Sequence, residues 1–115
     1  MRPHEELPLF VLWSDFLHWL LDRTEKFPKH VRFTLSGRID AYALDVFEGI
    51  VEARYTRTRM EILKRIDLAL EKLRLLLRVV HQRRYLSHDQ YEYASSIVHE
   101  AGRMVGGWIK ESGKA

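Results

Sequence analysis

The distribution of proline constrains this chain more than any other feature of its sequence. Prolines occur only at positions 3, 8 and 28, so after Pro28 no residue interrupts a helix by lacking an amide proton. Apolar residues in that part of the chain recur about every 3.6 residues, which is the period of an amphipathic α-helix. The sequence therefore predicts an all-α protein.

The first three helices are expected at about residues 9–24, 28–55 and 58–84. In the second of these, the segment KFPKHVRF places Pro28 in the first turn, where its missing N–H is tolerated. In the third, Thr58 is the candidate N-cap residue.

A fourth helix is expected to continue to about residue 110. Ser87 and Gln90 have the spacing of a capping box, which marks its beginning. The links between the four helices are only two to five residues long, so neighbouring helices are expected to run antiparallel. We predict an up-down-up-down four-helix bundle that forms a single domain over residues 1–115.

The sequence shows no arrangement of catalytic residues. Cysteine is absent, which excludes disulfides and thiolate chemistry, and none of the six histidines has the spacing of zinc ligands. Asp15 and His18 form one carboxylate–histidine pair, whereas a di-metal bundle needs two such pairs and two further carboxylates. Ser87 and His88 could in principle act as a nucleophile and its base, but Ser87 is already explained as a helix cap. We expect no catalytic residue, no metal site and no cofactor.

The beginning of the chain and its apolar runs bear on its location. The start, MRPHEELPLF, has two glutamates where the apolar core of a signal peptide would begin. The longest apolar runs are four or five residues, compared with about 20 for a membrane-spanning helix. We expect a soluble cytoplasmic protein without a membrane partner.

The third helix has apolar residues on two faces. Leu68, Leu75 and Val79 lie nearly opposite its core stripe, at about 100° per residue. Every helix of a four-helix bundle has a face toward solvent, and exposed apolar patches commonly mark association. We predict that these three residues contact another subunit; the alternative is a few tolerated surface residues. The core stripe comprises Leu63, Ile66, Leu70, Leu73, Leu77 and Val80.

The charged residues are segregated along the chain. Residues 54–84 contain ten Lys or Arg and three acids, a net charge of +7, whereas residues 40–52 contain four acids and no base. Such a surface attracts anionic polymers, because arginine and lysine bind phosphates and displace counterions. We predict phosphate and shape recognition with little sequence readout; the alternative is a solvated face. The predicted nucleic-acid contacts are Arg54, Arg57, Arg59, Lys64, Arg65, Arg74, Arg78, Arg83 and Arg84.

Three glycines interrupt the expected fourth helix. Each costs about 1 kcal/mol relative to alanine in a helix interior, and Gly102 and Gly106 share one face of the helix. We predict that they permit close approach by another subunit, with Trp108 as the anchor. The alternative is that Gly106 and Gly107 end the helix and Trp108 folds back over the core of its own chain.

Residues 70–111, LEKLRLLLRVVHQRRYLSHDQYEYASSIVHEAGRMVGGWIKE, resemble the accessory variability protein (Avd) family of diversity-generating retroelements. The most specific parts are LR followed by LLR, then YLS, and the tail GRMVGGWI. The earlier segments WSDFLHWLLDRTEKFPKHVRFTLSGRID and ALDVFEGIVEARYTR are similar to the same family. This family is part of a broader group of four-helix proteins, which includes those encoded in intervening sequences of 23S ribosomal RNA.

The resemblance implies a function. Members are not known as enzymes, and they form a five-fold barrel of bundles with a basic surface. The Avd branch binds nucleic acid and its cognate reverse transcriptase during error-prone copying of a template RNA into cDNA. The resemblance thus implies a homopentamer whose partners are RNA or DNA and a reverse transcriptase. A ribosomal-RNA-associated bundle is the alternative, and a small enzyme with an arginine-lined pocket is a distant one.

Overall fold

The computed structural model describes residues 3–113, with side chains from residue 8 onward. The two glutamates that argue against a signal peptide therefore lie outside the described side chains. The chain forms four α-helices and two short helical turns between the first and second of them. The elements are α1 (Pro3–Thr24), the 3₁₀ turn η1 (Lys29–Val31), the π turn η2 (Arg32–Ser36), α2 (Gly37–Arg54), α3 (Met60–Gln82) and α4 (His88–Ser112).

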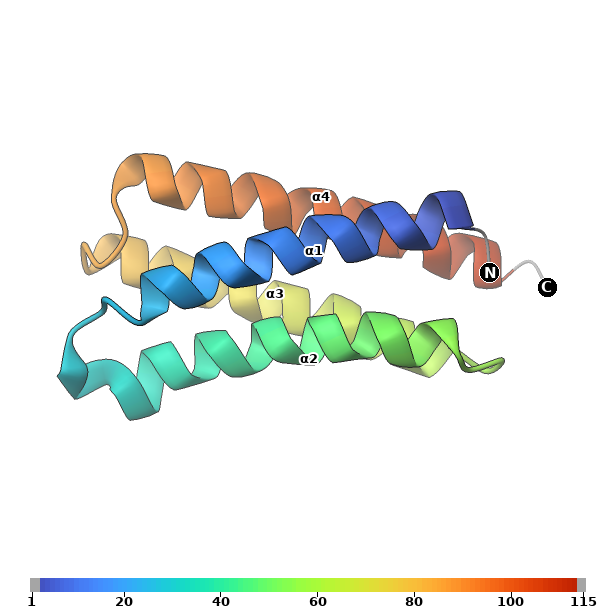
Figure 1. Ribbon diagram of the computed structural model, residues 1–115, viewed down its shortest axis with the longest axis horizontal. Helices are drawn as coiled ribbons and strands as arrows, with labels where there is room; N and C mark the ends of the chain where they lie inside the picture. The colour runs from blue at the N-terminus through green and yellow to red at the C-terminus, as the bar shows by residue number, and fades with distance from the viewer. Residues whose placement is uncertain (1–2, 114–115) are drawn as a thin grey trace.

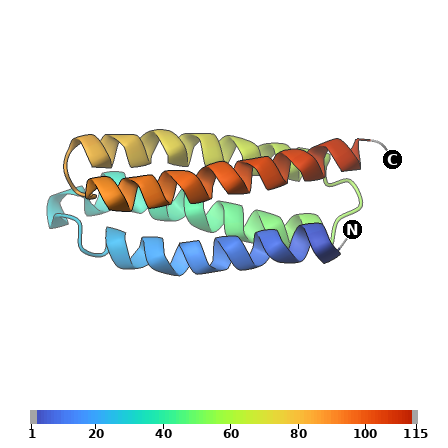
Figure 2. The same cartoon turned by 90° about the horizontal axis from the view of Figure 1, so that it is seen from above.

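The four helices form an up-down-up-down bundle, as predicted (Figures 1 and 2). The connection between α1 and α2 and the turn between α3 and α4 lie at one end of the bundle. The turn between α2 and α3 lies at the other end, beside the start of α1 and the end of α4. Both α1 and α3 pack against α2 and α4, so α1 and α3 are diagonal to each other.

The core consists of one apolar stripe from each helix. All six residues of the predicted core stripe on α3 are buried. Trp13 and Phe16 of α1 are fully buried, and the Trp13 indole Nε1–H donates to the Ala43 carbonyl oxygen of α2 at 2.9 Å. Gly49 of α2 lies against Ile66 of α3, where a Cβ added to the glycine would be 2.7 Å from Ile66 Cγ1. This absence of a side chain permits the close contact between α2 and α3.

The beginnings of α1 and α2 differ from the prediction. α1 starts at Pro3 and continues through Pro8, so one missing N–H near the start of a helix is tolerated. Pro28 is not in the first turn of α2, because its ψ of 140° is extended. Instead η1 and η2 precede α2, which begins at Gly37; a Cβ there would lie 3.0 Å from the Arg32 carbonyl oxygen.

Both ends of α3 also differ from the prediction. Arg59, not Thr58, occupies the N-cap position of α3, and it makes no side-chain cap hydrogen bond. α3 ends at Gln82 because Arg84 has a positive φ of 66°. The amides of Arg84 and Tyr85 donate to the carbonyls of His81 and Val80 at 3.0 and 2.9 Å, the two bonds of a Schellman motif.

α4 begins at the predicted capping box and continues past its glycines. The Ser87–Gln90 capping box is confirmed, with both of its hydrogen bonds present. The helix continues through Gly106 and Gly107 to Ser112, so the alternative in which these glycines end it is wrong. Trp108 is only 4% exposed within the single chain. Its side chain is a core residue, which corrects its expected role as an anchor for another subunit.

Candidate nucleic-acid and subunit interfaces

The nine predicted phosphate contacts form a band along the bundle and not one cluster. Arg54 ends α2, Arg57 and Arg59 lie in the following turn, and Arg83 and Arg84 follow α3 at the opposite end. The 23 residues of α3 separate these two groups by about 34 Å, at 1.5 Å per residue. The middle of the band consists of Lys64, Arg65, Arg74 and Arg78, all with exposed side chains.

Two cations of this band are ion-paired within the chain. Arg65 Nη2 lies 3.2 Å from Glu52 Oε1 of α2. Arg74 donates from Nε to Glu71 Oε2 at 3.1 Å and forms a second bond to the other carboxylate oxygen. These bonds lower the pKa of the Glu71 carboxyl and raise the pKa of the Arg74 guanidinium. Arg65 and Arg74 would have to exchange a carboxylate for a phosphate to bind nucleic acid.

Six of the other cations of the band have no carboxylate partner among the described residues. Lys64 and Arg78 lie on the exposed face of α3. Arg59 donates from Nε to the Thr56 carbonyl oxygen at 3.0 Å, which leaves its charge unneutralised. Arg57 and Arg84 are likewise exposed without a described ion pair, and Arg83 contacts only the ring and hydroxyl of Tyr85. All of these cations except Arg59, which is half-buried, combine exposure with unneutralised charge.

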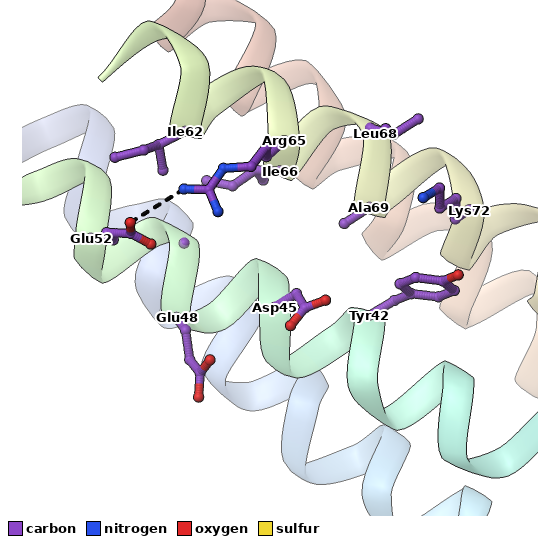
Figure 3. Close-up of a pocket in the computed structure, with 11 residues that line it drawn as sticks. Tyr42, Asp45, Glu48, Glu52, Ile62, Arg65, Ile66, Leu68, Ala69 and Lys72 are labelled. Carbon is purple, nitrogen blue, oxygen red and sulfur yellow. Dashed lines mark hydrogen bonds and ion pairs between the residues drawn. The ribbon is translucent and has the colours of Figure 1, made fainter. Parts of the chain in front are cut away.

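The groove between α2 and α3 brings the acidic and basic segments together (Figure 3). It has a volume of about 410 Å³. Asp45, Glu48 and Glu52 line it from α2, and Arg65 and Lys72 line it from α3. Lys72 Nζ lies 5.6 Å from the centre of the Tyr42 ring, which is within the range of a cation–π contact. The acidic wall makes this groove unsuitable for a polyanion.

The predicted subunit contacts differ in exposure. Leu68 and Leu75 are 54% and 47% exposed, and Val79 is half-buried. They lie between the acidic groove and the side of α3 that carries Lys64 and Arg78. The second apolar stripe is thus uncovered within one chain.

The glycines of α4 create open surface. A Cβ at Gly102, Gly106 or Gly107 would meet no atom within 4 Å. No described part of the same chain therefore uses the close approach that these glycines allow. Contact of Gly102 and Gly106 with another subunit remains a prediction.

Comparison with known proteins places this bundle in a family. The family model described as bAvd-like matches residues 11–112, nearly the whole chain. The chain belongs to the bAvd-like family. The resemblance found in the sequence is therefore confirmed. No curated protein matches the sequence.

A solved structure shares the fold of this bAvd-like chain. It is the crystal structure of a protein of unknown function from the S23 ribosomal protein family of Bacteroides thetaiotaomicron, with a TM-score of 0.83. The two sequences are 15% identical, and the match covers 92% of this chain and 98% of the other. At this identity the likeness concerns the fold alone.

The bAvd-like chain has a second basic segment that the sequence analysis missed. Residues 26–38, which run from the connection after α1 into the first turn of α2, contain Lys26, Lys29, Arg32 and Arg38 and no acid. This signal was readable in the sequence. The rings of Phe27 and Tyr85 lie 5.7 Å apart between centres. This contact places the segment beside the turn that carries Arg83 and Arg84, so cations of two separate segments gather at one end of the bundle.

Other kinds of site are not found in the described part of the bAvd-like chain. No three His, Asp or Glu side chains among its described residues gather where they could hold a metal ion. None of the helices within residues 3–113 is long and apolar enough to cross a membrane.

Proposed function

We propose that this protein is a non-catalytic, cytoplasmic accessory protein of a diversity-generating retroelement. It binds RNA or DNA through the cations of α3 and the adjoining turns, and it associates with the reverse transcriptase to support mutagenic cDNA synthesis. The observation that carries this proposal is the bAvd-like match across residues 11–112 of a bundle with a basic band.

The unpaired cations support polymer binding by their placement. Lys64 and Arg78 are 14 residues apart on α3, which corresponds to about 21 Å along the helix axis. Arg57 and Arg84 extend the band beyond both ends of α3. A polyanion that follows the band contacts several phosphates and releases their counterions, whereas a small anion contacts only one position.

The proposed assembly is a homopentamer. The exposed leucines of α3 support a subunit contact, because Leu68 and Leu75 are large apolar side chains left uncovered by their own chain. The five-fold arrangement itself rests on the likeness to the Avd family. Repetition of the basic band in each subunit multiplies the phosphate contacts available to one nucleic acid.

The test of nucleic-acid binding uses charge removal at two unpaired cations. Fluorescence anisotropy measures the affinity of a labelled structured RNA, and of the matching DNA, between about 50 and about 200 mM salt. The double variant Lys64→Gln/Arg78→Gln should bind more weakly, and the slope of log affinity against log salt should fall by about 2, one for each lost phosphate contact. The double variant Arg103→Gln/Lys110→Gln on α4 removes the same charge outside the predicted band.

The control separates site binding from a net-charge effect. Arg103 is already paired with Glu100, so the α4 variant should keep the salt slope of the unmodified protein. Equal loss in both double variants, or no binding of either polymer at about 50 mM salt, would refute the basic-band proposal. Association with the polymerase is tested by co-purification with a reverse transcriptase encoded beside the gene. Absence of such a gene, or failure of the two proteins to co-purify, would refute the retroelement assignment.

A ribosomal-RNA-associated role is the second candidate. It is favoured by the fold shared with a protein from the S23 ribosomal protein family. The genomic neighbourhood distinguishes the two candidates, because a retroelement accessory protein should be encoded beside a reverse transcriptase gene and a template and variable repeat pair.

A further inference from the structure

The basic end of the bundle contains a pocket that is separate from the α3 band. It lies between the end of α1, the η1 and η2 turns and the first turn of α2, and its volume is about 600 Å³. Pockets that bind small molecules in proteins span about 300–1,000 Å³. The polar and charged residues that line it include Thr24, Lys26, Lys29, Arg32, Ser36 and Asp40.

The rim of this pocket is cationic. Lys26, Lys29 and Arg32 are exposed, and none of them makes an ion pair or hydrogen bond through its side chain with another described residue. Glu25 also lines the pocket and is exposed. Three cations against one exposed carboxylate give the rim a net positive charge, which favours an anion with more than one negative charge, such as a phosphate monoester.

The inner wall is polar. The Thr24 hydroxyl is buried and donates to Asp40 Oδ1 at 2.6 Å, which leaves the second carboxylate oxygen of Asp40 available as an acceptor. The Ser36 side chain is also buried, and its hydroxyl has no hydrogen-bond partner among the described residues. Buried polar groups in folded proteins are nearly always partnered. The Ser36 oxygen is inaccessible from the pocket in its present rotamer, so it would gain a partner from a ligand only if the side chain turned toward the pocket.

We propose that this pocket binds a phosphorylated ribose, with the phosphate at the rim and the sugar hydroxyls toward the inner wall. Lys29 and Arg32 bind the phosphate, and Asp40 accepts a hydrogen bond from a ribose hydroxyl. The Ser36 hydroxyl, turned toward the pocket, hydrogen-bonds a second ribose hydroxyl. The orientation of the ligand follows from the burial of these side chains. The exposed cations bind its phosphate, and the half-buried Asp40 carboxyl binds its sugar hydroxyls.

The phosphorylated ribose could belong to either of two ligands, a free mononucleotide or the 5′-terminal nucleotide of a strand. The pocket lies at the same end of the bundle as Arg83 and Arg84, as the contact between Phe27 and Tyr85 shows. A strand whose end enters the pocket would have cations beside it for its next phosphates. Binding of a mononucleotide does not depend on the α3 band, so this proposal and the proposed function fail separately.

The test measures binding of adenosine 5′-monophosphate to the full chain by isothermal titration calorimetry. We expect saturable binding of one nucleotide per chain, with adenosine and inorganic phosphate each binding more weakly. The double variant Lys29→Gln/Arg32→Gln should weaken nucleotide binding by about tenfold or more, because charge-assisted hydrogen bonds to phosphate are lost.

A matched control removes the same charge away from the pocket and from the α3 band. Arg103 and Lys110 both lie in the second half of α4. Arg103→Gln/Lys110→Gln should change the affinity by less than about twofold, since screening weakens charges far from the ligand. Equal weakening in both double variants, or equal affinity for adenosine and its monophosphate, would overturn the proposal.

The Ser36→Ala variant gives a second measurement, which distinguishes a residue that binds the nucleotide from one that only supports the fold. Ser36→Ala removes an unpartnered buried hydroxyl, so it should raise the melting temperature of the free protein while it weakens nucleotide binding. Unchanged nucleotide affinity would remove Ser36 from the site and overturn the proposed orientation of the sugar.

Two trinucleotides distinguish the sources. A 5′-phosphorylated trinucleotide that binds at least about tenfold more tightly than both its 5′-hydroxyl form and the mononucleotide identifies a strand end as the ligand. A mononucleotide that binds as tightly as the phosphorylated trinucleotide identifies the free nucleotide. If neither saturates the protein, the pocket does not bind phosphorylated ribose.

Discussion

Gly49 and Gly106 both lie in helix interiors, but only Gly49 is packed against a neighbouring helix. Gly49→Ala would place a Cβ 2.7 Å from Ile66 Cγ1 and 3.1 Å from its Cδ1. Overpacking of a core costs about 1–3 kcal/mol, whereas alanine gains about 1 kcal/mol over glycine in a helix. We therefore expect a lower free energy of unfolding for Gly49→Ala, measured by urea denaturation.

Gly106→Ala is the matched comparison, because its Cβ would meet no atom within 4 Å. Its free energy of unfolding should rise by up to about 1 kcal/mol, the difference in helix propensity. Equal stabilities for the two alanine variants would contradict the packing difference between α2 and α4.

Asp40 makes the stability of the protein depend on pH. Burial raises the pKa of this carboxyl above its ordinary value of 3.8, and the hydrogen bond from Thr24 opposes that rise only in part. The folded state therefore holds the Asp40 proton at pH values where the unfolded state has lost it. This contribution to stability is present below the unfolded pKa and is lost as pH rises through the folded pKa.

The comparison with Asp40→Asn isolates this effect. The free energy of unfolding of the unmodified protein, relative to that of Asp40→Asn, should decrease as pH rises above 3.8. Urea denaturation of both proteins at several pH values from about 3 to about 7 measures this difference. A difference that increases with pH would mean that the pKa of Asp40 is lowered in the folded protein.

The turn after α3 holds an arginine in a conformation that favours glycine. Arg84 has a φ of 66° at the position of a Schellman motif where glycine is most common. The left-handed conformation costs a residue with a side chain about 1–2 kcal/mol. Arg84→Gly should therefore raise the free energy of unfolding by about 1 kcal/mol and, if the guanidinium binds phosphate, weaken RNA binding.

Arg83→Gly separates these effects, because Arg83 has a φ of −85° and gains no relief from a glycine. It should lower stability, as measured by thermal unfolding. An Arg84→Gly variant that gains no stability would contradict the conformational cost assigned to this turn.

The helical elements were predictable where the apolar pattern and the caps agree. The core stripe of α3 and the capping box of α4 depend on spacing within one helix, and both are found as expected. The π turn Arg32–Ser36 was not predictable, because its place depends on how the connection packs at the end of the bundle. Whether Trp108 is buried in its own chain also depends on packing, since glycines within a helical pattern allow either a helix end or a continuous helix.

The same limit applies to the candidate site. The pair Glu71–Arg74 could be read from its spacing of three residues on one helix. The pair Glu52–Arg65 joins two helices and needs their relative position. Sequence alone therefore identified the basic band but not which of its charges are already neutralised.

Over the whole molecule, large apolar residues are exposed on all four helices, but only those of α3 were predicted to bind another copy. Leu68 of α3 is 54% exposed and Val11 of α1 is 49% exposed, yet α1 and α3 lie diagonally across the bundle. If the α3 stripe is the subunit contact, Leu68→Glu buries a charge in that contact, whereas Val11→Glu leaves its charge in water.

Sedimentation velocity should therefore show a smaller species for Leu68→Glu, down to the 13.7 kDa of one chain. Val11→Glu should keep the mass of the unmodified protein, and circular dichroism should show the same helix content in both variants. Loss of assembly in Val11→Glu alone would move the contact to α1. If the unmodified protein is itself a monomer, there is no subunit contact on α3. Leu68 is then a tolerated surface residue, because single apolar side chains are common on the surfaces of folded proteins.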